Sequence, residues 1–233
     1  MDSSKDTQPE LVFDTAQWVN VVYSTTIADG RTAGSLNLGA VFDVQVNAIF
    51  GVTAFNQDAY DLEGDGLPEI VWVPPASELA NVAIGSTLAA LPNAKFISDS
   101  VSPLTALASS GLGDVSSDGF SELALALRTA VAPDVHEVQV VDGASLNAVA
   151  LGFPLDLGTA GAGVKLRIGG ITAEDSLAAT VASVLDLDGD GRHELIVSDA
   201  ARGEIYVIRG VDIANALAAG DAELNMEMLF NDE

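Results

Sequence analysis

One nine-residue pattern recurs along this chain, and such recurrence constrains the fold strongly, because each repeat of this spacing builds one structural unit. The pattern is D-x-[DES]-x-D-G-x-x-E, and copies of it start at Asp61, Asp114 and Asp186. A fourth, degraded copy starts at Asp2 but has Thr7 in place of the glycine at position 6. The four starts lie 53 to 72 residues apart. Residues 1–233 are therefore expected to form one region of about four repeats.

The segments around the loops repeat as well. Residues 204–210, EIYVIRG, match residues 137–143, EVQVVDG, position by position. In the last repeat, strands are expected at 178–185, 194–198 and 204–208, with a turn at 200–203 and a turn or two of helix within 211–219. No long helices separate the strands, so parallel pairing is not expected. The sequence predicts an all-β fold with four-stranded antiparallel blades, as in a β-propeller or a piece of a larger one.

The recurring loop offers oxygen atoms at positions 1, 3, 5 and 9, and the backbone carbonyl of position 7 can add another. Calcium is a hard cation that takes six to eight such ligands, and the glycine at position 6 permits the sharp turn. An EF-hand loop differs, because its acid stands at position 12 and helices flank it. The alternative for a single loop is an Asp/Gly-rich turn whose side chains bond only the backbone. Repetition at the same offsets favours the calcium interpretation.

The candidate calcium sites differ in their number of carboxylates. The strongest set is Asp186, Asp188, Asp190, the carbonyl of Arg192, and Glu194. The next is Asp61, Glu63, Asp65, the carbonyl of Leu67, and Glu69. A weaker set has one hydroxyl in place of a carboxylate: Asp114, Ser116, Asp118, the carbonyl of Phe120, and Glu122. The degraded loop, with Asp2, Ser4, Asp6 and Glu10, is expected to bind nothing.

Composition limits the partners. A formal net charge of −25 repels nucleic acid and anionic lipid but attracts cations. There are no cysteines, which excludes disulfides and thiol chemistry. No apolar stretch reaches the roughly 18 residues needed to span a membrane, so no membrane insertion is expected. The first residues lack an apolar signal core, so a signal for export would lie outside this chain.

With these loops in place, the sequence resembles the FG-GAP repeat family, which includes the propeller repeats of integrin α-subunits. Phe50-Gly51 stands where the family has its Phe-Gly pair, and Val73-Pro74-Pro75 takes the place of the Gly-Ala-Pro that follows the loop. The resemblance implies calcium held between adjacent strands of a blade. It also implies an extracellular or cell-surface module for adhesion or recognition of a protein or glycan ligand. One departure is that position 9 is Glu here, where the family mostly has Asp.

The alternative function is a propeller domain of a secreted hydrolase that acts on polysaccharide, since paired acids can hydrolyse glycosides. The sequence has no nucleophile motif. Of its two histidines, His136 is expected in a turn and His193 is expected to point to solvent. We therefore expect a protein that is not an enzyme. Three full repeat periods are too few for a seven-bladed ring. Either the two ends pair to close a small ring, or other blades of a longer polypeptide or a partner chain cover the open edges, and the second is expected.

Overall fold

β-Structure dominates the part of the chain that the structure, a computed structural model, describes. That part comprises residues 11–15, 18–22, 44–47, 61–62, 64, 69–72, 80–83, 95–98, 104–129, 136–150, 153–158, 163–169, 177–184, 186–220 and 222–225. Within it, fifteen strands form four sheets and two helices are present. The all-β prediction is confirmed at this level.

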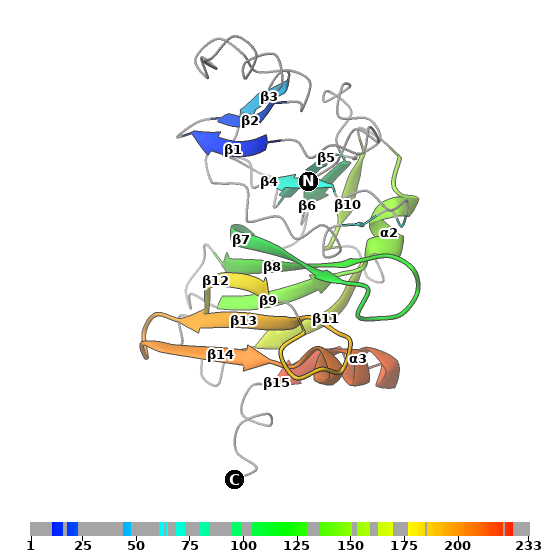
Figure 1. Ribbon diagram of the computed structural model, residues 1–233, viewed down its shortest axis with the longest axis vertical. Coiled ribbons are helices and arrows are strands. Elements are labelled where there is room, and N and C mark those ends of the chain that lie inside the picture. Colours follow the sequence, from blue (N-terminus) through cyan, green and yellow to red (C-terminus); the bar gives the residue numbers. More distant parts are fainter. Residues whose placement is uncertain are drawn as a thin grey trace.

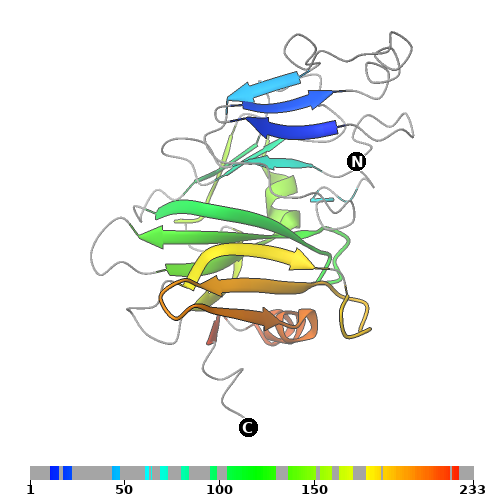
Figure 2. The same cartoon turned by 60° about the vertical axis from the view of Figure 1, so that its left-hand side comes forward.

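The four sheets follow one another along the long axis of the molecule (Figures 1 and 2). The first, in spatial order, is β1 (Leu11–Thr15), β2 (Trp18–Val22) and β3 (Val44–Asn47). The second is β10 (Pro154–Asp156), β6 (Lys95–Ser98), β5 (Ala80–Ala83) and β4 (Ile70–Trp72). The third is β15 (Glu223–Asn225), β11 (Val164–Gly169), β9 (His136–Val141), β8 (Glu122–Thr129) and β7 (Leu104–Gly113). The last is β12 (Leu177–Val184), β13 (Glu194–Asp199) and β14 (Glu204–Ile208).

Two sheets share the same wiring around an Asp-rich loop. In the third sheet, β7, β8, β9 and β11 pair antiparallel in chain order, and the loop at 114–121 joins β7 to β8. In the last sheet, β12, β13 and β14 pair antiparallel in the same order, and the loop at 186–193 joins β12 to β13. The loops therefore connect antiparallel neighbours, and no helix flanks either of these two loops, as an EF-hand would require.

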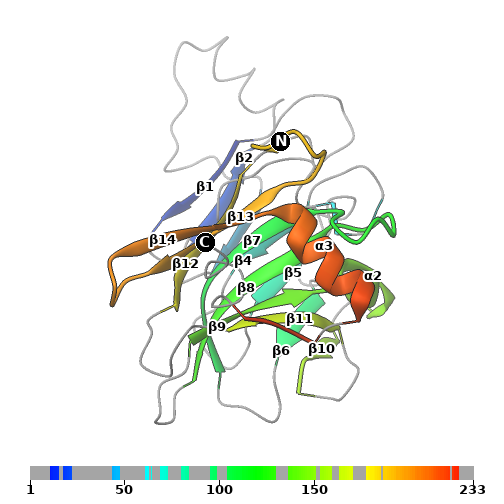
Figure 3. The ribbon, with the colours of Figure 1, turned by 90° about the horizontal axis from the view of Figure 1, so that it is seen from below.

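Each of these sheets continues into a helix at a matching glycine. Helix α2 (Gly143–Ala148) follows β9, and helix α3 (Gly210–Ala219) follows β14. The carboxylate of Asp142 caps α2 by accepting a hydrogen bond from the backbone N–H of Ser145 at 2.9 Å. Figure 3 shows both helices on the same side of the sheets. The sequence anticipated α3 only as a turn or two, and it did not anticipate α2.

The expectation of purely antiparallel pairing is wrong at two places. Strand β10 pairs parallel with β6, and β15 pairs parallel with β11. In both cases a three-residue strand that follows a helix joins the outer strand of the preceding sheet. The connection between the paired strands is most of a repeat, with three strands and a helix, so no dedicated crossover helix is needed. These strands tie each of the last two repeats to the repeat before it.

The core lies between successive sheets, and β8 is buried on both faces. Its leucines, Leu123, Leu125 and Leu127, pack toward the preceding repeat with Leu62 and Ile97. Its alanines, Ala124 and Ala126, pack toward the following repeat with Leu195 and Ile213. The larger side chains on one face and the smaller ones on the other let neighbouring sheets stack closely on this central strand.

Candidate cation sites in the repeated loops

The glutamate at position 9 holds each loop to the strand that follows it. Glu122 and Glu194 are the first residues of β8 and β13, Glu69 directly precedes β4, and all three are at most 1% exposed. In each loop, Oε2 accepts a hydrogen bond from the backbone N–H at position 2. The donors are Leu62 at 2.5 Å, Val115 at 2.9 Å and Leu187 at 2.6 Å. The longer Glu side chain spans the base of the loop in all three repeats.

The aspartate at position 1 organises the middle of the loop. Asp186 Oδ1 accepts hydrogen bonds from the N–H groups of Gly189 and Asp190, and its Oδ2 accepts one from Gly191. Asp114 does the same with the N–H groups of Asp118 and Gly119, at 2.9 and 3.0 Å. Because a carboxylate has about four lone-pair sites on its two oxygens, these bonds orient the group and still leave acceptor capacity for a cation.

Position 5 is fixed by a tight local turn. Asp190 Oδ1 accepts from the N–H of Arg192 at 2.8 Å, and Asp118 Oδ1 accepts from the N–H of Phe120 at 3.0 Å. The position-6 glycines have φ values of +92° (Gly119) and +87° (Gly191). Side chains disfavour this region of backbone space, so the predicted need for glycine is confirmed in both loops.

The carboxylates gather as the spacing predicts. In the last loop, one oxygen from each of Asp186, Asp188, Asp190 and Glu194 lies within 4.8 Å of all the others. In the loop before it, Asp114, Asp118 and Glu122 form the same kind of group. The three aspartates of the last loop are exposed and its glutamate is buried, so a cation would reach the cluster from solvent and meet a buried carboxylate at its base.

Two buried oxygen atoms make these loops fit a cation better than an empty turn. Among the described residues, Glu194 Oε1 is buried without a hydrogen-bond partner. Ser116 Oγ, at position 3 of the preceding loop, is also buried and unpartnered within that part of the chain. Leaving a buried polar oxygen unpaired is unfavourable, more so when it carries charge. A bound cation would satisfy such atoms.

The structure reaches only part of the other sites. Asp61 and Glu69 are described, whereas Glu63, Asp65 and Leu67 lie outside the described residues, as do Asp2, Ser4, Asp6 and Glu10. Arg192 and Phe120 stand at position 7 in the observed loops, where their carbonyls remain the predicted ligands. Arg209 flanks the last loop. Its two hydrogen bonds to Asp212 raise the pKa of the Arg209 guanidinium, and the charges of Asp188 and Asp190 raise it further.

The two histidines lie differently from the sequence expectation. His193 is half-buried and its Nδ1 lies 3.4 Å from Ser183 Oγ, so it does not simply point to solvent. His136 is the first residue of β9 and does not occupy a turn.

Sequence reasoning also missed the role of position 2. Leu62 and Val115 are buried against the next repeat and anchor their loops there. An apolar residue at position 2 of every clear copy, Leu187 included, was the available signal.

Comparisons with protein-family models and with curated proteins give no match for this chain. Within the described residues, no helix is long and apolar enough to cross a membrane.

Proposed function

We propose that this chain is a calcium-binding module built from FG-GAP-like propeller repeats. In this proposal the loops at 61–69, 114–122 and 186–194 hold the ions. The module belongs to an extracellular or cell-surface protein and serves adhesion, ligand recognition or structural assembly, with a protein or glycan as its ligand.

The observation that carries the proposal is the four-carboxylate cluster of the last loop, with the unpartnered Glu194 Oε1 at its base. Its side-chain ligands are all oxygens, which suits a hard cation and disfavours zinc or copper. Calcium accepts an irregular cage of oxygens, whereas magnesium demands a near-ideal octahedron and gives up its waters reluctantly. A surface loop whose shape is set by hydrogen bonds to its own backbone offers an irregular cage of oxygens, which suits calcium better than magnesium.

The propeller assignment rests on the repeated wiring. The antiparallel order β7-β8-β9-β11 has the number of strands of one blade, and the Asp-rich loop joins its first two strands. The last sheet repeats the first three strands of that order. Strands β10 and β15 link each unit to the preceding one.

The outer face of the last sheet supports a larger assembly. On β14, Ile205 and Val207 are 71% and 42% exposed, and Leu187, in the loop between β12 and β13, is 65% exposed. Leu187 corresponds to Leu62 and Val115, which are buried by the next repeat in their own loops. Because exposed apolar side chains on an otherwise uncovered sheet face favour association, the expected occupant is a further repeat of the same kind, supplied by a longer polypeptide or by a partner chain.

Thermal unfolding in calcium, in magnesium and in a chelator tests the proposed function. A cation that binds only the folded chain stabilises it by about 2.7 kcal/mol per site at a hundredfold excess over Kd. We expect millimolar calcium to raise the melting temperature and magnesium to do little. An identical melting temperature in chelator and in calcium would refute occupied sites.

A further inference from the structure

The last two repeats stack on each other through two unlike faces. The third sheet contributes an outward face, which carries Val138 and Val140 of β9. The last sheet meets it with an inward face, which carries Leu195 and Val197 of β13. All four side chains are buried in one hydrophobic cluster. The contact is heterologous, because the outward face of one repeat packs against the inward face of the next.

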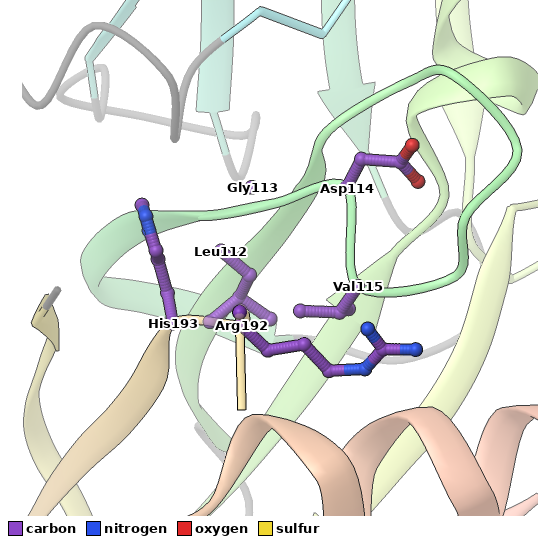
Figure 4. Close-up of a pocket in the computed structure, with 7 residues that line it drawn as sticks. Leu112, Gly113, Asp114, Val115, Arg192 and His193 are labelled. Atoms are coloured by element: carbon purple, nitrogen blue, oxygen red, sulfur yellow. The ribbon is translucent and has the colours of Figure 1, made fainter. Parts of the chain in front are cut away.

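The loops of these two repeats meet at the same contact. Val115, at position 2 of the earlier loop, is buried in that hydrophobic cluster. It borders the pocket drawn in Figure 4 together with Gly191, Arg192 and His193, which are positions 6 to 8 of the later loop. Position 2 of a loop therefore belongs to the outward face of its repeat and lies beside the loop of the next repeat.

The last sheet carries the same outward face, but there it is open. The register of β14 on β13 repeats that of β9 on β8, so Ile205 and Val207 occupy the positions of Val138 and Val140. Leu187 again stands at position 2 of the loop. These three residues are 42% to 71% exposed, whereas their counterparts in the preceding repeat are at most 1% exposed. The open face thus has the arrangement that, one repeat earlier, binds an inward face.

The first sheet, at the opposite end of the molecule (Figures 1 and 2), has residues at the positions of an inward face. Leu11 directly follows the position-9 glutamate of the degraded loop, as Leu195 follows Glu194. Leu11 and Phe13 of β1 therefore occupy the positions of Leu195 and Val197 of β13. Strand β1 also pairs antiparallel with β2, as β13 does with β14. One chain thus offers an outward face at one end and the positions of an inward face at the other.

We propose that the outward face of the last sheet binds the first sheet of a second copy of this chain, head to tail. The contact rests on the repeats of the proposed function, and it makes a partner chain, not a longer polypeptide, the source of the further repeat. A heterologous contact closes into a ring or continues into a filament, so more than two copies can join. The net charge of −25 opposes association at low salt, but it is screened beyond about 8 Å at physiological ionic strength.

Two variants, each altered at one end, test the contact at physiological salt in the presence of calcium. The outward-face variant carries Ile205→Glu and Val207→Glu, and the first-sheet variant carries Leu11→Glu and Phe13→Glu. We expect light scattering to show association of the unaltered chain and monomers for each variant alone. An equimolar mixture should form dimers, since one intact contact remains. Phe153→Glu adds charge at another exposed apolar residue and should associate like the unaltered chain.

Cross-linking gives a second measurement that holds even if a glutamate variant fails to fold by circular dichroism. The chain has no cysteine, so Ile205→Cys and Phe13→Cys each introduce a single thiol. A short bismaleimide should join these two variants to each other in a mixture, and it should join neither of them to itself. It should also fail to join either variant to Phe153→Cys.

Three results would overturn the contact. One is a first-sheet variant that still dimerises alone, because two outward faces would then bind each other. Another is an unaltered chain that stays monomeric at all concentrations, and the third is a mixture without the Ile205→Cys to Phe13→Cys cross-link. Calorimetric calcium titration of the same samples separates the two proposals. A monomer that binds calcium refutes only the head-to-tail contact, whereas an oligomer that binds no calcium refutes the proposed calcium sites.

Discussion

At the scale of single residues, the two carboxylate oxygens of the position-9 glutamate differ in their hydrogen bonding. Oε2 of Glu194 accepts the Leu187 N–H, a structural bond that needs no cation. Oε1 is buried and unpartnered among the described residues. The first oxygen shapes the loop, and the second is the atom that a cation would satisfy.

The substitution Glu194→Gln separates the structural hydrogen bond of Oε2 from the cation binding expected of Oε1. The amide oxygen can still accept the Leu187 N–H, but the buried charge is gone. We predict a melting temperature in chelator equal to or above that of the unaltered chain, because an uncompensated buried charge is costly. In saturating calcium we predict the loss of that loop's stabilisation, about 2.7 kcal/mol at a hundredfold excess over Kd. Equal destabilisation in both conditions would mean that Glu194 is only structural.

The two observed clusters should also rank in affinity. Asp190→Ala removes a carboxylate from a group of four, whereas Asp118→Ala acts on a group of three with Ser116 at position 3. We predict a larger loss of calcium-linked stability for Asp190→Ala, measured as the difference in melting temperature between calcium and chelator. Asp6→Ala is the matched change in the degraded loop and should alter nothing. A bound ion lost with Asp6 would contradict the interpretation of that loop.

At the scale of elements, the loops at 61–69 and 114–122 pack closely against each other at Gly64. Gly64→Ala would place a methyl group 2.5 Å from the Gly119 carbonyl at a backbone φ of +69°. Gly203 has the same φ, and a Cβ there meets nothing within 4 Å. Gly203→Ala should therefore cost only the roughly 1–2 kcal/mol of left-handed backbone. Gly64→Ala should cost more, by about 1–3 kcal/mol for the overlap. Equal losses in urea unfolding would show that the loops do not touch.

The sequence predicted elements well where a pattern repeated. The strand at 204–208 and the loop register follow from alternation and from the fixed offsets of Asp, Gly and Glu, whereas the ten-residue helix α3 was anticipated only as a turn or two. Strands β10 and β15 could not be predicted, because three residues carry no periodicity and their partners belong to the preceding repeat. The burial of Glu122 and Glu194 was missed as well, since spacing marks a ligand but does not reveal a hydrogen bond back across the loop.

At the scale of the whole molecule, the last sheet has one covered face and one open face. Leu195 and Val197 of β13 pack on the preceding repeat, while Ile205 and Val207 of β14 remain exposed. In the third sheet, β8 is the strand that corresponds to β13, and it is covered on both faces. An apolar face that is open to solvent favours association.

Replacing Ile205 and Val207 together by Glu should therefore reduce self-association without unfolding the chain. We expect light scattering to show concentration-dependent association of the unaltered chain and a shift toward monomer for the double variant. Phe153→Glu changes another exposed apolar residue, 63% exposed and distant in sequence from this face, and should have no such effect. A compact monomer at all concentrations would contradict the prediction that this exposed face causes association.

The central claim, that the repeated loops are calcium sites, is tested most directly by calorimetric titration of the unaltered chain with calcium. We predict saturable binding at two or more sites, with dissociation constants at or below about 0.1–1 mM, the range of extracellular calcium modules. Magnesium should give little heat under the same conditions. The absence of saturable calcium binding at millimolar concentrations, with the chain folded by circular dichroism, would contradict the account.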